Sequence, residues 1–267
     1  MAVTIKDVAR EARVSVASVS RALNGHASVT DQTRRRIMRI AEELRYMPHG
    51  AARSLITRRT QTIGALLPDL HGEFFSELIR GIDLAARARG LHLLVSSSHD
   101  DAREAAAALR AMQGRVDGLL VMSPHVDAGF LRNNVAADLP MVLMNTPMSG
   151  PQYATLNVDN YGGAFAMVKH LIGCGHRRIA LIAGPQHNFD AAERLRGYNA
   201  AIAKFAAMIP PQIFHGDFTE ESGYRAGQEL LALKVRPQAV FAANDIMAAG
   251  CLYAFKEAGV RVPTDIA

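Results

Sequence analysis

The chain has 267 residues, 49% of them hydrophobic, so it can bury more than one core and is not a disordered tail. Two cysteines are too few for a disulfide framework or a cysteine zinc site, and the ten histidines are scattered without ligand spacing, so no metal or cofactor is expected. The net charge of +5 is concentrated in residues 1–60, which carry 12 Lys and Arg against 5 Asp and Glu, whereas the remainder carries 18 against 20.

The first 24 residues predict two short helices separated by a tight turn. Thr4 and Asp7 form a capping-box pattern, so the first helix should begin at Ile5. Ser15 is placed to cap a second helix, which ends at Asn24. The side chains on the outward face of the second helix are slender enough for the major groove of DNA: Val16, Ala17, Ser18, Ser20 and Arg21.

A third helix should begin after Thr30 and close a small three-helix core. Its apolar positions are Ile37, Ile40, Ala41 and Leu44. The pattern fits a helix-turn-helix domain, and the alternative is a generic small helical bundle. The local positive charge favours DNA, since attraction to phosphates supplies most non-specific affinity. The arginines at 34–36 and 39 either contact phosphate or form a solvated helix face.

The segments TIKDVA, VSVASVSRALN and YMPHGAARSL resemble the lactose/galactose repressor (LacI/GalR) family of bacterial transcription regulators, and the resemblance runs along the whole chain. It implies that Val16, Ala17 and Arg21 contact base edges. Arg21 can fork onto guanine O6 and N7, whereas the two apolar residues suit a thymine methyl. The hydroxyls suited to phosphate are those of Ser15, Ser18 and Ser20. One departure is Arg13, where relatives commonly have Gly or Asn, so a positive φ there would strain the arginine.

Residues 48–60 are small and polar, and composition alone predicts a linker. In the family, the matching segment is a hinge that becomes helical on operator DNA, pairs with its dimer mate and inserts a leucine into a minor-groove base step. The resemblance therefore implies that Leu55 is the wedge, with Arg53 and Ala52 beside it. The alternative is a plain tether. The expected DNA-contacting residues are Thr4, Ser15, Val16, Ala17, Ser18, Ser20, Arg21, Asn24, Arg53 and Leu55.

From residue 62 onward, short apolar runs alternate with longer amphipathic segments, which predicts parallel sheets covered by helices on both faces. The predicted strands are 63–67, 91–95, 118–122, 141–144, 179–183 and 239–243. The predicted helices are 74–89, 102–113, 160–174, 191–207 and 245–258. The fold class is thus a helix-turn-helix headpiece (1–47) and hinge (48–60), followed by an α/β core of two lobes (61–159 and 160–267). The family shares such a periplasmic-binding-protein-like core.

Candidate effector residues lie in loops just past the strands, because ligands bind at the carboxyl ends of parallel strands. They are His71, Phe74, Asn145, Asn188, Asp190, Arg194, Phe218 and Asn244, with Asp69 in the first loop. The resemblance implies that the arginine of the motif running from Gly184 to Tyr198, here Arg194, grips ligand hydroxyls or a carboxylate. Aromatic planes with forked polar groups suit a sugar or sugar acid, although a nucleobase would also fit. For each of the other residues, a cap or turn role is an equal alternative.

An enzyme is the main competing class of protein. The run from His99 to Asp101 suggests acid–base chemistry, but neither a GxSxG nucleophile motif nor a GxxxxGK[ST] phosphate loop accompanies it. Such residues at a strand-to-helix turn are usually caps, so we expect no catalysis. No apolar run reaches membrane-spanning length, and the start carries Lys6 and Asp7 rather than a signal peptide, so we expect a cytoplasmic protein with no membrane partner.

These observations predict a sequence-specific regulator, with a repressor favoured, that binds a pseudo-palindromic operator as a homodimer and responds to a small metabolite. Dimer contacts are expected from helix 74–89 and from further C-terminal elements that this chain lacks. The alternatives are an activator, or a small-molecule-binding protein with a non-specific nucleic-acid arm. The chain ends at Ala267 where a strand should begin, so we expect a fragment of a longer regulator, incomplete at the C-terminus.

Overall fold

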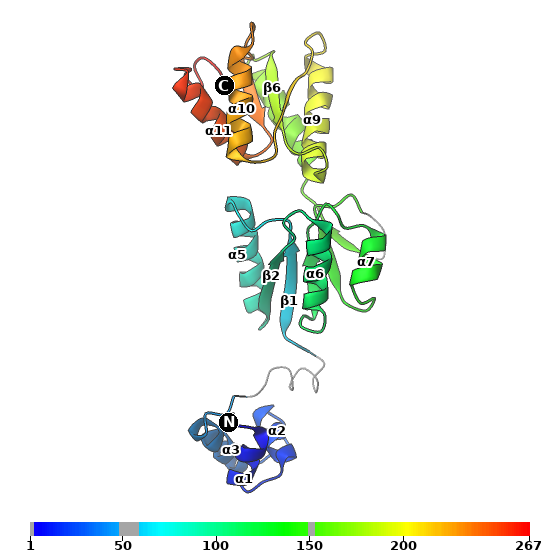
Figure 1. Cartoon of the computed structure of the whole chain (residues 1–267), viewed down its shortest axis with the longest axis vertical. Helices are drawn as coiled ribbons and strands as arrows, with labels where there is room; N and C mark the ends of the chain where they lie inside the picture. Colours follow the sequence, from blue (N-terminus) through cyan, green and yellow to red (C-terminus); the bar gives the residue numbers. More distant parts are fainter. Residues whose placement is uncertain (1–2, 48–58, 149–152) are drawn as a thin grey trace. The chain divides into compact units, whose positions relative to one another are not determined.

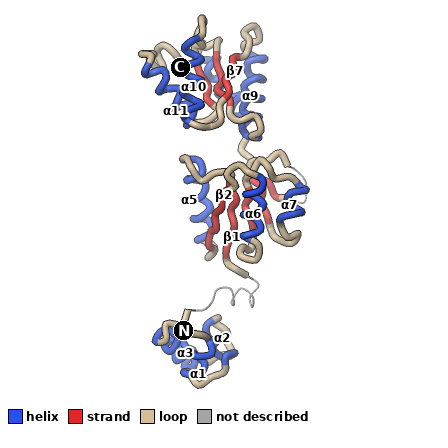
Figure 2. The backbone as a smooth tube through the Cα atoms, viewed as in Figure 1, coloured by secondary structure: helices blue, strands red, loops and turns tan. Residues whose placement is uncertain are grey.

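The computed structural model describes residues 3–47, 59–148 and 153–267 (Figures 1 and 2). The chain divides into two compact units, the first made of residues 1–62 with 114–117 and the second of the remaining residues. The predicted hinge contacts of Ala52, Arg53 and Leu55 lie outside the described residues. Within the described ranges, no helix is both long and apolar enough to cross a membrane.

The N-terminal unit contains the three predicted helices, α1 (Ile5–Glu11), α2 (Val16–Leu23) and α3 (Asp31–Glu43). Their apolar faces meet in one core, in which Val8, Val19 and Ile37 are fully buried. Arg34 on α3 joins the helices, because its guanidinium donates to the carbonyl oxygen of Ala22 (3.2 Å), in the last turn of α2, and to that of His26 (2.7 Å), beyond the end of α2. Arg34 therefore has a structural role, which the sequence pattern had not separated from phosphate contact.

The N-terminal part of the α/β core, here called the first α/β layer, consists of one sheet and its helices. The sheet has five strands in the order β2-β1-β3-β4-β5. Its strands are β1 (Thr62–Leu67), β2 (His92–Ser97), β3 (Gly118–Val121), β4 (Met141–Met144) and β5 (Ala154–Leu156). The pairings of β1 with β3, β3 with β4 and β4 with β5 are parallel, as predicted. The associated helices are α5 (Glu73–Arg87), α6 (Ala102–Met112) and α7 (Ala128–Asn134) (Figure 1).

The second sheet has three parallel strands in the order β7-β6-β8. These strands are β6 (Ile179–Ala183), β7 (Gln212–His215) and β8 (Ala239–Ala242). The helices are α8 (Asn160–Gly173), α9 (Phe189–Phe205), α10 (Glu220–Ala232) and α11 (Asp245–Glu257).

Strand β6 is buried on both faces, which explains its uninterrupted apolar sequence. Ile179, Leu181 and Ala183 belong to one core with residues of α8 and α9. Ala180 and Ile182 belong to a separate core with residues of α10 and α11. The period of two along the strand thus sends alternate side chains into two helix layers. This confirms that helices cover both faces of the second sheet.

Glycines let each helix pair of the second sheet approach until backbones touch. A methyl group on Gly250 of α11 would overlap the carbonyl oxygen of Glu220 on α10, and one on Gly223 would overlap the backbone of Met247. On the opposite face, a methyl group on Gly197 of α9 would overlap the carbonyl oxygen of Tyr161 on α8. Both helix layers of this sheet therefore depend on positions without a side chain.

Candidate DNA-binding and effector sites

Helix α2 presents the predicted base-reading side chains on its outer face. Val16 keeps 41% of its surface exposed, and Ala17 and Arg21 are exposed as well. The helix is capped by Ser15, whose hydroxyl accepts the Ser18 amide proton at 3.1 Å and pairs with the Ser18 hydroxyl at 2.9 Å. The cap fixes the N-terminal turn of α2, the part of a recognition helix that reaches base edges.

Three local features hold α1 and α2 in this arrangement. The Thr4 amide and hydroxyl both donate to the Asp7 carboxylate, at 3.0 and 2.7 Å, and these bonds lower the pKa of Asp7. Arg13 adopts a φ of 52° in the turn between the helices, so the positive φ anticipated at this position is present. At the other end, the Asn24 amide donates to the Ser20 carbonyl oxygen at 2.9 Å. Thr4, Ser20 and Asn24, which are predicted to contact DNA, therefore also take part in the hydrogen bonds that organise the helix ends.

Four polar side chains at the beginnings of α8 and α9 and after β4 form a connected group, here called the polar cluster: Asn145, Asn160, Asp190 and Arg194. The Asp190 carboxylate accepts one bond from the Asn145 amide and one from the Asn160 amide, both at 2.8 Å. Arg194 donates from Nε to the Asn160 oxygen at 2.8 Å and from its terminal nitrogen to the Ala243 carbonyl oxygen. Three of the four were predicted from their positions after strands or in the arginine motif.

The polar cluster contains two opposite charges that are partly shielded from water. Burial raises the pKa of Asp190, although the Arg194 charge and the Asn145 bond act in the opposite direction. Burial likewise lowers the pKa of Arg194, against the charges of Asp190 and Asp245. Such groups are costly to bury unless they find hydrogen-bond partners. A carboxylate, a guanidinium and two amides together offer donors and acceptors that match adjacent hydroxyl groups.

Phe218 lies just after β7 in a strained backbone conformation, with a φ of 71°. Asn244 holds this loop, since its amide donates to the Phe218 carbonyl oxygen at 3.0 Å while its oxygen caps α11 by accepting the Met247 amide proton at 2.9 Å. A methyl group on Gly184 would overlap the Phe218 ring and lie 3.0 Å from the Ala191 side chain. The aromatic ring therefore occupies space left open by Gly184, the residue that follows β6.

The structure does not connect every predicted effector residue to the polar cluster. His71 and Asp69 are both exposed and pair with each other, with Nδ1 and the carboxylate 3.0 Å apart. Phe74 is 55% exposed and packs edge-on against Phe75 with ring centroids 5.2 Å apart. Asn188 caps α9 by accepting the Ala191 amide proton at 3.0 Å. Their ligand roles stay predictions.

Asn160 and Asp245 were not among the predicted site residues, although both contribute to the environment of Arg194. Asn160 was placed only as the first residue of a helix, and its buried amide joins Asp190 to Arg194. The signal that could have identified it is an amide at a helix start following a short strand, the same position that drew attention to Asn188 and Asn244.

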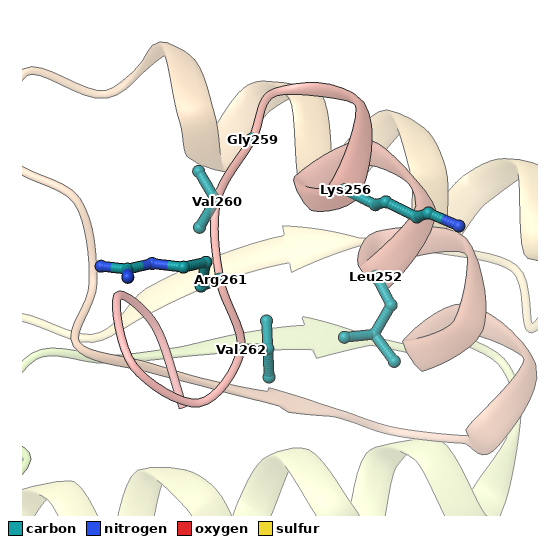
Figure 3. A pocket seen from close by; sticks show the side chains of 6 residues that line it. All are labelled: Leu252, Lys256, Gly259, Val260, Arg261 and Val262. Atoms are coloured by element: carbon teal, nitrogen blue, oxygen red, sulfur yellow. The ribbon is translucent and has the colours of Figure 1, made fainter.

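A separate hollow lies at the end of α11 (Figure 3). It is lined by Leu252, Lys256, Gly259, Val260, Arg261 and Val262. The Arg261 guanidinium is paired with the Asp265 carboxylate at 3.0 and 3.1 Å, which leaves mainly aliphatic groups facing the hollow. It lacks the converging donors and acceptors of the polar cluster and is therefore the weaker candidate for a hydroxyl-rich ligand. Among the residues that the structure describes, no group of three His, Cys, Asp or Glu side chains could hold a metal ion.

Comparison with known proteins agrees with both halves of this architecture. Residues 4–49 match the family described as bacterial regulatory proteins, lacI family. Residues 60–267 match the family of periplasmic binding proteins and the sugar binding domain of the LacI family. The chain belongs to the LacI family. The resemblance seen in the sequence, the regulator function and the two-part fold are thereby confirmed.

Individual LacI-family relatives match nearly the full length of this chain. The HTH-type transcriptional repressor PurR of Erwinia tasmaniensis is 38% identical over 98% of the chain and 78% of the relative. The Lac repressor dimer bound to operator and the anti-inducer ONPF superimposes with a TM-score of 0.88 at 29% identity, covering 100% of this chain and 81% of that one. A complex of the transcriptional regulator CelR with cellobiose has a TM-score of 0.67 at 32% identity, covering 99% and 81%.

Proposed function

We propose that this LacI-family regulator represses transcription from the bacterial cytoplasm, where it binds a pseudo-palindromic operator as a homodimer. The observation that carries the proposal is the outer face of α2, where an exposed arginine stands beside small apolar side chains on a capped helix. Phosphate contacts position such a helix, and contacts to base edges give it specificity. The base-reading residues of the proposal are Val16, Ala17 and Arg21, and the phosphate-contacting ones are Thr4, Ser15, Ser18, Ser20 and Asn24.

Dimerisation follows from how little sequence one recognition helix can read. A single helix contacts only a few base pairs, so a unique genomic site requires two half-sites about one helical turn apart. The Lac repressor neighbour, which is described as a dimer on its operator, supports this arrangement. Helix α5, on which Leu84 keeps 56% of its surface exposed, is our candidate for part of the dimer contact.

We further propose that the effector is a sugar or sugar derivative held by the polar cluster with the Phe218 ring against it. Sugars present alternating hydroxyl groups and an apolar face, which match forked polar side chains and an aromatic ring. The match to a sugar binding domain and the cellobiose complex of a relative favour this class over purines. Effector binding would alter operator affinity through its preference for one conformation of the core.

Selection from a DNA pool tests the proposed function. The full chain is incubated with randomised pseudo-palindromic duplexes, alone and with monosaccharides, disaccharides, sugar phosphates or purines, at two salt concentrations. We expect enrichment of one palindromic sequence and a change in its recovery with one sugar class. No enrichment in any condition would refute the regulator, and a response to purines alone would refute the sugar assignment.

Replacing Gly184 by Ala should weaken sugar binding about tenfold, the loss of ~1.4 kcal/mol expected when one aromatic contact is misplaced. The added methyl group cannot coexist with the Phe218 ring in its present position, and Ala191 blocks the methyl group from the other side. Calorimetric titration with the sugar identified by selection measures the effect. Gly163→Ala on the exposed side of α8, where a methyl group meets nothing within 4 Å, is the control and should bind the sugar unchanged. Equal affinity in both variants would remove Phe218 from the site.

A further inference from the structure

The carboxylate of Asp117 accepts hydrogen bonds from the two residues that precede the first strand of the core. Its Oδ1 accepts the Thr60 amide proton at 2.7 Å and the Thr60 hydroxyl proton at 2.8 Å. Its Oδ2 accepts the Gln61 amide proton at 2.8 Å. The Asp117 amide in turn donates to the Thr62 carbonyl oxygen at 2.7 Å. Residues 60–62, which precede and begin β1, are thus tied to the residue just before β3.

The segment held by Asp117 is bent and further fixed by its own side chains. Gln61 adopts a φ of 54°, a left-handed conformation that a non-glycine residue keeps only when its surroundings impose it. The Thr60 hydroxyl accepts the Thr62 amide proton at 3.3 Å, and the Thr62 hydroxyl donates to the Thr60 carbonyl oxygen at 3.2 Å. Local bonds and the carboxylate therefore act together to set one direction for the chain at this turn.

Asp117 is suited to this task across the physiological pH range. Burial raises its pKa, but the bonds from Thr60 and Gln61 and the charge of Arg59 outweigh burial and hold the pKa below its usual value. The carboxylate stays ionised, and bonds to an ionised acceptor are stronger than neutral ones. Asp117 lies in the connection between α6 and β3, 56 residues along the chain from Gln61, so the carboxylate is a long-range fixing point and not a local turn residue.

We propose that Asp117 is a positioning residue for operator binding, which fixes the backbone conformation of residues 60–62 where the DNA-binding segment joins the core. The inference rests on the proposed function and adds a residue that contacts neither DNA nor effector. Two headpieces must meet half-sites at a fixed spacing, so a variable backbone conformation at this junction adds an ordering cost to specific binding. Non-specific binding comes from charge alone and has no such geometric requirement.

Asp117→Ala should weaken binding of the full chain to its selected operator by about tenfold, or ~1.4 kcal/mol, with less than a twofold change on random-sequence DNA. Asp127→Ala is the matched control, because Asp127 also accepts a backbone amide proton, that of Phe130 at 2.7 Å, at the start of α7 in the same α/β layer. Both variants lose a carboxylate bond, and only the first should lose operator discrimination. Equal losses on operator and random DNA, or the same loss in both variants, would overturn the proposal.

A second measurement tests the hydrogen bonds of Asp117 directly. Amide hydrogen exchange at Thr60 and Gln61 should be slow in the unaltered chain and fast in Asp117→Ala. Fast exchange at both amides in the unaltered chain would also overturn the proposal. If Asp117→Ala does not fold, Asp117→Asn is the second variant. Its side-chain oxygen can still accept from Thr60, but its NH2 group cannot accept the Gln61 amide proton, so the loss of operator affinity should be smaller and in the same direction. Failure of the unaltered chain to select any sequence would refute the proposed function, whereas normal selection by Asp117→Ala would refute only the role of Asp117.

Discussion

Replacing Arg21 by Ala is expected to abolish operator selection while leaving non-specific DNA binding nearly intact. A guanidinium that forks onto guanine O6 and N7 gives about 1–3 kcal/mol of discrimination against the wrong base. A dimer on a pseudo-palindrome makes this contact twice, so the two losses add on the operator. Arg21 is exposed on α2, and the fold of the headpiece does not depend on it, because the core is formed by Val8, Val19 and Ile37.

Arg35→Ala is the matched control for this experiment. Arg35 is an exposed arginine on α3, so the variant loses the same charge without altering the outer face of α2. Loss of a phosphate-type contact should weaken binding about equally on all sequences and reduce the slope of affinity against salt by about 1. Binding isotherms on operator and random DNA at several salt concentrations separate the two behaviours. The base-reading role of Arg21 is rejected if both variants weaken all sequences alike.

Gly250→Ala should destabilise the second α/β lobe by about 3 kcal/mol or more, at the upper end of the range for overpacked sites. A methyl group at this position meets the carbonyl oxygen of Glu220 and the backbone amide of Tyr224, neither of which can move without shifting α10. The strain is therefore backbone against backbone and cannot be relieved by a change of rotamer. Urea or thermal unfolding of the full chain, followed by circular dichroism, measures the loss.

The same substitution elsewhere in the lobe should have the opposite sign. Gly163 lies on the exposed side of α8 with nothing within 4 Å of an added methyl group. Alanine there lowers the entropy of the unfolded chain and should stabilise the protein by about 0.4–1 kcal/mol. Equal stability of Gly250→Ala and Gly163→Ala would show that α10 and α11 are not packed as closely as described.

The headpiece could be predicted from sequence almost residue by residue because its signals are local. A capping box, a serine N-cap and a threonine N-cap mark the starts of α1, α2 and α3, and the structure confirms each start. The long buried strands were equally clear, since β6 is buried at every residue and its sequence is uniformly apolar. Local chemistry and uniform burial are both visible in one sequence.

The elements that were missed lack these signals. Strand β5 has three residues, all exposed, and β7 has only partly buried residues and an exposed His215. Helix α10 contains Gly223 and Gly227, which lower helix propensity by about 1 kcal/mol each and suggest a loop. Those glycines serve the contact with α11, so the tertiary structure determines the helix there. Helix α7 was missed because it has only 7 residues.

The candidate effector site was predictable only in part. Position after a predicted strand identified Asn145 and Asp190, because parallel strands bring their carboxyl ends to one edge. The same rule also selected His71 and Phe74, which the structure leaves exposed. What connects the cluster is the buried amide of Asn160, and that pairing depends on how α8 and α9 pack.

The glycine contacts between helices have a mechanical consequence for signalling. Side chains that interlock can change rotamer and absorb a small displacement, but backbones in direct contact have no such freedom. With α8 fixed to α9 and α10 fixed to α11 in this way, the second lobe has little internal flexibility with which to adjust to a bound ligand. A ligand that displaces Arg194 or Asp190 would therefore move the lobe as one rigid body. The flexibility needed for an allosteric response would then reside in the chain segments that connect the lobe.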